Sequence, residues 1–145
     1  MLIAVLNGPN LNLLGTREPE IYGRQTLAEL EKEVRAEAGR LGVDLEWKQT
    51  NHEGEFVELV QGQRGREDGA LVNAGAFTHT SLAIRDAFLA VSVPFVEVHL
   101  SNIFAREPER RHSRLADLAL GVMAGFGPEG YRLGLQALVS RLRGR

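Results

Sequence analysis

Residues 2–10 read LIAVLNGPN, five apolar side chains followed at once by a turn of asparagine, glycine and proline. A short apolar run of this kind is typical of a strand in an α/β protein. The residues after Leu6 are turn formers that end the strand. The sequence therefore predicts that the chain opens on a strand from Leu2 to Leu6.

Further short apolar runs follow, and segments of helical period separate them. The other expected strands are Val43 to Trp47, Ala70 to Val72, Pro94 to Val98 and a fifth near Ala119 to Ala124. Strands that alternate with helices indicate an α/β protein with a parallel sheet, and right-handed crossovers place helices on both of its faces. The predicted architecture is a flavodoxin-like three-layer α/β/α sandwich with a five-stranded parallel sheet.

The helix starts are predicted from capping chemistry. Thr26 and Glu29 form a capping box, and Gly42 suits the end of the same helix. The expected caps or first residues of the later helices are, in chain order, Asn51, either Thr78 or Thr80, and Pro128.

The bulk properties narrow the class of protein. A chain of 145 residues fits one domain, residues 1–145. Its formal net charge of -2 gives no basic surplus for nucleic acid or for an anionic membrane, and the absence of cysteine excludes a thiolate nucleophile. The run from Leu2 to Leu6 is too short for a signal peptide, and nothing approaches transmembrane length. We expect a cytoplasmic protein.

Polar residues gather where the predicted strands end. Those at or just after the first, third and fourth strands are Asn7, Asn10, Asn73, His99, Ser101 and Asn102. Taken alone, each is more readily explained as a turn or loop residue. Because the carboxyl ends of parallel strands share one edge of the sheet, their coincidence at three strand ends predicts a ligand site at that edge.

The fourth strand carries the strongest local signal. Glu97 and His99 are two residues apart, so their side chains leave the same face of the strand. A carboxylate can orient an imidazole and hold its proton, which suits a general acid, although a plain ion pair at a strand end explains the pattern equally well. Ser101, Arg106 and Arg110 follow, and together they suit a small carboxylate that carries hydroxyl groups.

The segment from Gly15 to Arg24 has no periodicity and lies between the first strand and its helix. Loops of this length in compact domains are often lids, so we expect a lid at about residues 15–24. Tyr22 in this loop suits plain packing or catalysis. Arg17 favours catalysis, because a nearby cation lowers the pKa of a tyrosine below its ordinary value of about 10 and makes the phenolate a competent base.

Two other residues give weak signals on their own. His79 opens a helix, where anions bind, and Asp86 looks like a solvated surface charge. The four histidines show no metal-binding spacing, so no metal site is expected. No glycine-rich nucleotide loop follows the first strand, which weighs against a nucleotide cofactor.

Five long segments resemble the signature motifs of the type II 3-dehydroquinate dehydratases. They are LNGPNLNLLGTREPEIYG (6–23), QTNHEGEFVELVQ (49–61), LVNAGAFTHTSLAIRDA (71–87), PFVEVHLSNIFAREPERRHS (94–113) and GVMAGFGPEGY (121–131). The resemblance covers nearly the whole chain in the right order. It implies a cofactor-free hydro-lyase that converts 3-dehydroquinate to 3-dehydroshikimate in the shikimate pathway, by anti elimination of water through an enolate.

The same resemblance implies a role for each catalytic candidate. Tyr22 matches the base that removes a proton from C2, and Arg17 the lid arginine that keeps it as phenolate. Asn10 matches the residue that, with a bound water, stabilises the enolate oxygen. His99 matches the general acid for the departing C1 hydroxyl, and Glu97 its orienting partner.

The substrate-binding positions are implied in the same way. Asn73 and the backbone of Leu100 and Ser101 match the carboxylate pocket, and His79 and Arg110 match groups that bind the ring hydroxyls. Asp86 matches a residue supplied by a neighbouring subunit, which implies a homo-oligomer, the trimer-based dodecamer of the family.

Two other functions remain open at this point. A flavodoxin-like binding or signalling module is one, although a receiver domain would need acidic residues where this chain has Asn7 and Asn10. A different cofactor-free lyase or isomerase acting on a related hydroxy acid is the other, and only the resemblance argues against it. The sequence also leaves open whether the enzyme serves aromatic biosynthesis or quinate breakdown.

Overall fold

The computed structural model of the chain describes residues 1–16 and 18–144, with Tyr22 described by its backbone alone. Its parallel strands form one sheet in the order β2-β1-β3-β4-β5. The strands are β1 (Leu2–Asn7), β2 (Asp44–Gln49), β3 (Gly69–Asn73), β4 (Phe95–His99) and β5 (Gly121–Ala124). This strand order is that of the flavodoxin-like folds, so the predicted fold class is confirmed.

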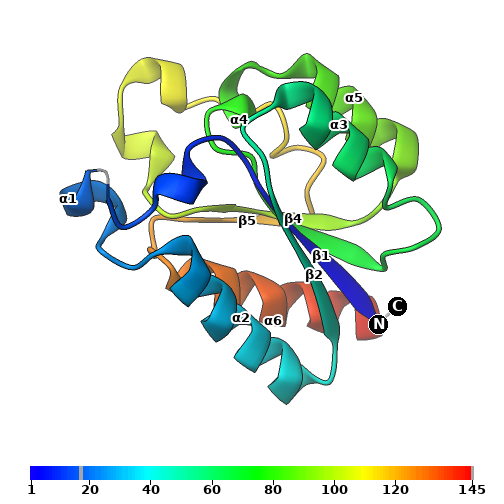
Figure 1. Cartoon of the computed structure of the whole chain (residues 1–145). Coiled ribbons are helices and arrows are strands. Elements are labelled where there is room, and N and C mark those ends of the chain that lie inside the picture. The colour runs from blue at the N-terminus through cyan, green and yellow to red at the C-terminus, as the bar shows by residue number, and fades with distance from the viewer. Residues whose placement is uncertain (17, 145) are drawn as a thin grey trace.

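Helices cover both faces of the sheet, as Figure 1 shows: α2 and α6 lie on one side, and α3 and α5 on the other. The α-helices are α1 (Pro19–Tyr22), α2 (Leu27–Leu41), α3 (Glu53–Gln61), α4 (Phe77–Thr80), α5 (Leu82–Val91) and α6 (Glu129–Arg143). The 3-10 turns are η1 (Leu11–Leu13), η2 (Ile103–Ala105) and η3 (Pro108–Arg110). Within the described residues, none of the helices combines the length and apolar character that crossing a membrane requires.

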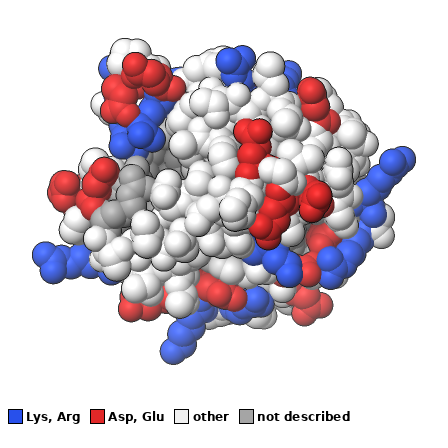
Figure 2. All heavy atoms as spheres, turned by 45° about the horizontal axis from the view of Figure 1, so that its top comes forward, with Lys and Arg blue, Asp and Glu red and all other residues white. Residues whose placement is uncertain are grey.

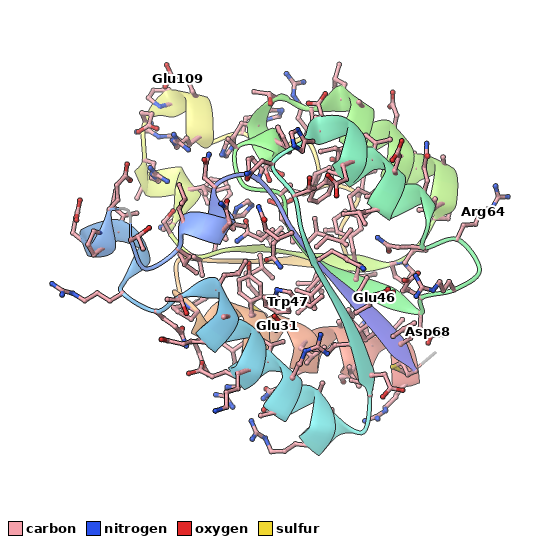
Figure 3. All side chains as sticks on the ribbon, viewed as in Figure 1. Glu31, Glu46, Trp47, Arg64, Asp68 and Glu109 are labelled. Carbon is pink, nitrogen blue, oxygen red and sulfur yellow. The ribbon has the colours of Figure 1, made fainter. Side chains whose placement is uncertain are left out.

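The apolar run of β1 supplies both halves of the core. Ile3 and Val5 face the α2–α6 layer, whereas Ala4 and Leu6 face the α3–α5 layer, because successive side chains of a strand point to opposite sides. Trp47 of β2 lies between the sheet and the α2–α6 layer (Figure 3), and its ring stacks on that of Tyr131 with 6.0 Å between the centroids. β1 lies between β2 and β3 in the sheet.

The strand ends differ from the prediction by one or two residues. β3 and β4 each extend one residue further, so Asn73 and His99 are the last paired residues of their strands rather than loop residues. β5 begins at Gly121 instead of near Ala119, because the backbone N–H of Ala119 bonds to Leu115 O in a turn. The pairing fixes the direction of both polar side chains at the carboxyl edge.

The cap of α2 was predicted correctly and that of α3 was not. Thr26 Oγ1 accepts the backbone N–H of Glu29 at 3.2 Å. The N-cap of α3 is His52, whose side chain makes no capping bond. Asn51 was expected there, but its Oδ1 accepts the backbone N–H of Asn10 at 2.9 Å, so it is used to join two loops.

The cap of α5 is Ser81, which corrects the expectation of Thr78 or Thr80. Both threonines lie in the short helix α4, which the sequence pattern did not separate from α5. Ser81 has extended backbone geometry, as a cap requires, and its Oγ accepts the N–H of Ile84 at 3.0 Å.

The segment expected to be an irregular lid contains the helix α1. Pro19 is its first residue, where a missing N–H costs nothing, and Gly23 ends it with a positive φ of 80°. Figure 1 places α1 outside the carboxyl edge of the sheet. Arg17 lies outside the described residues, so its predicted position is untested.

A buried carboxylate joins α2 to α6. Glu37 accepts a hydrogen bond from Gln136 Nε2 at 2.7 Å and is paired with Arg40. These bonds, that of Gln136 above all, hold the pKa of Glu37 below its ordinary value of 4.5. The resulting stability is fully present above pH 4.5, where the unfolded chain is also ionised, and is lost as the pH falls through the lowered pKa.

A Glu37→Gln variant is therefore expected to lower the free energy of unfolding by about 1 kcal/mol at neutral pH. The deficit should shrink as the pH falls below 4.5 towards the lowered pKa, because the carboxyl of the unfolded chain takes up its proton there and that of the folded protein does so only at lower pH. Denaturant unfolding at pH 7 and pH 3.5 measures it. Glu31→Gln, which breaks only an exposed pair with Arg35, is the control and should cost under about 0.5 kcal/mol. An equal deficit at both pH values would contradict this account of Glu37.

Candidate active site

A cleft lies at the carboxyl edge of the sheet, where β1, β3 and β4 end, and encloses about 680 Å³ of empty space including open solvent. Its lining residues are Pro9, Asn10, Leu11, Leu14, Asn73, Gly75, Ala76, His79, His99, Leu100, Ser101, Ile103, Arg106 and Arg110. Most of the site residues predicted from the sequence are therefore brought together. Glu97 lies behind His99 and Asp86 lies elsewhere, while Arg17 and the side chain of Tyr22 are outside the described part of the chain.

The loops after β1 and β3 pack directly against each other at the point where the strand order reverses. A Cβ on Gly8 would lie 2.3 Å from the carbonyl oxygen of Ala74, so only glycine fits. The N–H of Gly8 bonds to Asn73 O at 2.7 Å. This contact fixes the floor of the cleft at the switch point, where ligands bind in such sheets.

Asn10 is held at the cleft by its backbone. It adopts the left-handed conformation with φ 68°, which asparagine tolerates better than most residues. Its N–H bonds to Asn51 Oδ1, and Gln49 Nε2 donates to the same oxygen at 3.1 Å. Gln49 was not singled out from the sequence, because its role appears only once β2 is placed beside β1.

A buried chain of hydrogen bonds links the first and third strand ends. Tyr131 donates its hydroxyl proton to Asn7 Oδ1 at 2.7 Å, and the hydroxyl oxygen of Tyr131 accepts from Asn73 Nδ2 at 2.9 Å. Burial raises the pKa of Tyr131, which keeps the phenol protonated for this donation. Asn73 Oδ1 accepts the N–H of Gly75 at 3.2 Å. Tyr131 was not singled out from the sequence as a site residue.

Glu97 and His99 form a buried pair at the end of β4. His99 Nε2 lies 2.6 Å from Glu97 Oε2, and the two residues are only 5% and 0% exposed. A carboxylate accepts and does not donate, so Nε2 carries the proton and Nδ1 is left as the second ring nitrogen. The carboxylate therefore fixes the orientation of the ring, and a second proton on Nδ1 would give the charged form of His99.

A second imidazole stacks on the first. The rings of His79 and His99 are 6.4 Å apart at 21°. His79 Nδ1 lies 2.9 Å from His112 O, and because a carbonyl only accepts, Nδ1 must donate. Burial is the main reason why the pKa of His79 is lowered, so the ring is neutral at pH 7 and its Nε2 is a hydrogen-bond acceptor.

The charge of the lining suits an anion. Arg106 and Arg110 line the cleft, and none of its lining residues is acidic within the described chain. Arg110 is paired with Glu107, which holds its guanidinium in place. On the face shown in Figure 2, acidic and basic side chains are interspersed. Across residues 1–16 and 18–144, no group of three or more acidic or histidine side chains is placed to hold a metal ion.

Asp86 does not reach this cleft. It lies on the exposed side of α5, between Leu82 and Leu89, which are 56% and 53% exposed. These three residues are spaced four and three apart, so they share one face of the helix. The face is apolar around a single carboxylate, and nothing within the described chain covers it.

The sequence of the chain is similar to known proteins along nearly its whole length. A family model described as dehydroquinase class II matches residues 1–139. The chain belongs to this family. Among curated class II dehydroquinases and their relatives, it is 58% identical to a 3-dehydroquinate dehydratase of Gemmatimonas aurantiaca, over 98% of this chain and 93% of that protein. It is 55% identical to catabolic 3-dehydroquinase 1 of Aspergillus terreus, over 92% of this chain and 88% of that protein.

Solved structures of class II dehydroquinases have the same fold. The type II dehydroquinase of Butyrivibrio crossotus superposes with a TM-score of 0.92 at 38% identity, over 95% of this chain and 97% of that one. Since the chain resembles these proteins along nearly its whole length, the cleft of this class II dehydroquinase is its candidate active site.

Proposed function

We propose that this class II dehydroquinase converts 3-dehydroquinate to 3-dehydroshikimate as a cofactor-free hydro-lyase of the shikimate pathway. The observation that carries the proposal is the buried Glu97–His99 pair at the wall of a cleft with two lining arginines. Relatives at 58% and 56% identity are named 3-dehydroquinate dehydratase, which supports the same substrate. Residues 1–145 act as a single catalytic domain.

The reaction begins with removal of a proton from C2, next to the ring ketone. Tyr22, as phenolate, takes this proton, and Arg17 keeps the phenolate charged by its positive charge. Both belong to the segment 15–24, which we propose to be a lid that closes over the bound substrate. Closure excludes water and strengthens the electrostatic interactions inside the cleft.

The enolate formed at C2 and C3 needs hydrogen-bond donors, since an α-proton of a ketone leaves at neutral pH only when the resulting charge is stabilised. Asn10 supplies one through a bound water. Its location at the cleft and its backbone bond to Asn51 support this role, because they hold the backbone of Asn10 in place before substrate arrives.

The C1 hydroxyl leaves as water, which requires a proton because hydroxide is a poor leaving group. His99, protonated at both ring nitrogens, gives its Nδ1 proton as general acid, while Glu97 accepts the Nε2 proton, orients the ring and stabilises its charged form. The acid comes from a strand end and the base from the lid. They therefore approach opposite faces of the ring, which gives an anti elimination.

The remaining polar groups hold the substrate. The carboxylate at C1 binds to Asn73 and to the backbone of Leu100 and Ser101, which lie next to His99. Arg110 and His79 bind ring hydroxyls. The neutral His79 has an acceptor nitrogen, Nε2, which suits the O–H of a substrate.

Asp86 belongs to the site of a neighbouring subunit in this proposal, and the enzyme is a homo-oligomer, a dodecamer built from trimers. The exposed face of α5 supports this, because apolar side chains of this exposure on either side of a lone carboxylate suit a subunit contact. The cytoplasmic location expected from the sequence stays a prediction.

An Asp86→Ala variant is expected to raise KM by about tenfold or to reduce the oligomer, because it removes a charged hydrogen-bond partner at a shared site. Its fold should be unaffected, since Asp86 is exposed within its own chain. Steady-state kinetics and light scattering measure the two effects. Asp44→Ala, an exposed carboxylate at the amino end of β2, is the control. An unchanged KM together with an unchanged oligomer would contradict this assignment.

The proposed function is tested by adding 3-dehydroquinate to chelator-treated protein and following the ultraviolet absorbance of the conjugated enone product. Borohydride is added to a parallel sample. We expect product in both, because neither Lys32 nor Lys48 lines the cleft and no Schiff base is part of the reaction. Absence of product from folded protein would contradict the function, and inactivation by borohydride would contradict the mechanism.

A further inference from the structure

Residues 112–114, here called the strap, make hydrogen bonds to His79 and to Glu97, the partner of His99. His112 O accepts from His79 Nδ1 at 2.9 Å, and Ser113 Oγ donates to Glu97 Oε1 at 2.7 Å. The strap therefore reaches His79 directly and His99 through Glu97. Neither His112 nor Ser113 lines the cleft, so substrate does not contact them there.

We propose that Ser113 is a positioning residue for the reaction, acting on His99 through Glu97. The proposal rests on the function proposed above and adds to it a group outside the substrate's reach. Its basis is that the two oxygens of Glu97 have different partners: Oε2 bonds to His99 and Oε1 bonds to Ser113.

The direction of the Ser113 bond is fixed by its other partners. Ser113 Oγ accepts the backbone N–H groups of Leu115 and Ala116, each at 3.1 Å. With its lone pairs used in this way, the single hydroxyl proton is left for Glu97. Glu97 is 0% exposed. Among the described residues, loss of the Ser113 hydroxyl would therefore leave Oε1 as a buried carboxylate oxygen without that hydrogen-bond donor.

The strap is anchored independently of any ligand. The N–H of Arg114 bonds to Thr78 O at 2.8 Å, and Arg85 Nη1 donates to Arg114 O at 2.8 Å. Arg85 is itself held by Asp117 through two bonds of 2.6 and 2.9 Å. Ser113 therefore meets Glu97 with fixed geometry before substrate binds.

Glu97 Oε2 accepts the Nε2 proton of His99, and the hydroxyl of Ser113 donates to the other oxygen of the same carboxylate. Removing the hydroxyl should weaken the support that Glu97 gives to the charged ring and leave the substrate contacts in place. The expected signature is a fall in kcat with little change in KM, together with a shift of the alkaline limb of the rate profile to lower pH.

The first test is Ser113→Ala assayed with 3-dehydroquinate over a range of pH. We expect kcat to fall on the order of tenfold and KM to stay within about twofold. Thr50→Ala is the matched control: Thr50 Oγ1 also donates to a carboxylate, Glu55 at 2.8 Å, and accepts a backbone N–H, but has no link to an imidazole. It should lower Tm without moving the alkaline limb. A Ser113→Ala profile that coincides with wild type would overturn the proposal.

A double-mutant cycle with Glu97→Gln separates action through Glu97 from a general loss of structure. Ser113→Ala should cost on the order of tenfold in the wild-type background and no more than about twofold when residue 97 is already glutamine. Equal losses in both backgrounds would overturn the proposal. If the alanine variant does not fold, Ser113→Cys, which keeps the volume and has a weak donor, carries the same comparison.

The failure of the proposed function looks different from the failure of this inference. Wild-type protein without dehydratase activity would remove the function, and the inference with it. Wild-type activity combined with a Ser113→Ala enzyme of normal kcat and pH profile would remove only the role of Ser113.

Discussion

Replacing His99 with alanine is expected to lower kcat on the order of a thousandfold, because it removes the general acid that protonates the departing hydroxyl. The ring is buried beside Glu97 and reaches the cleft from a strand end, so no other described side chain takes its position. Leu100 and Ser101 keep their backbone places, and KM should change far less than kcat.

Steady-state kinetics with 3-dehydroquinate measure this effect, and circular dichroism verifies the fold. His52→Ala is the matched control, because His52 is exposed at the start of α3 and its side chain makes no capping bond. It should leave kcat unchanged within about twofold. A His99→Ala enzyme with near-normal turnover would remove His99 as the acid.

Replacing Tyr22 with phenylalanine is expected to have an equally large effect on kcat, on the order of a thousandfold or more, because it removes the base that takes the C2 proton. The change deletes one oxygen and little volume, so binding should persist. Titration of the variant with 3-dehydroquinate measures binding separately from turnover. Wild-type turnover in this variant would show that the base is another group.

Tyr131→Phe provides the contrast, since it also deletes one phenolic oxygen. Tyr131 is buried between Asn7 and Asn73, and its loss leaves Asn7 Oδ1 without a donor. The expected result is a loss of stability of about 1–3 kcal/mol rather than removal of a catalytic group. The pair of variants therefore distinguishes a phenol that reacts from one that supports the loops.

Sequence reasoning located the strands because their signal is local. Continuous apolar runs such as Leu2 to Leu6 can be buried only between two layers, and the turn residues that follow mark the carboxyl edge. The polar ends Asn73 and His99 could be assigned to one edge because parallel strands all end on the same side. The Glu97–His99 contact followed from the two-residue period of a strand.

The features that were missed depend on contacts between distant segments. Asn51 has the chemistry of a helix cap, but the loop after β1 comes within reach and takes its Oδ1. Ser113 is 16 residues from Glu97 and Tyr131 is 124 residues from Asn7, so no local pattern indicates either bond. Both positions are supports of the site rather than walls of it, and the packed fold is needed to find them.

The most direct test of the account uses 3-dehydroquinate that carries deuterium at the C2 position anti to the C1 hydroxyl. Mass spectrometry of the 3-dehydroshikimate formed shows whether the label is lost. Anti elimination, with a base in the lid and His99 on the opposite face, predicts product without deuterium. Product that keeps the deuterium would show that the two groups act from one face and would contradict the proposed arrangement of the site, and no product at all would contradict the function itself.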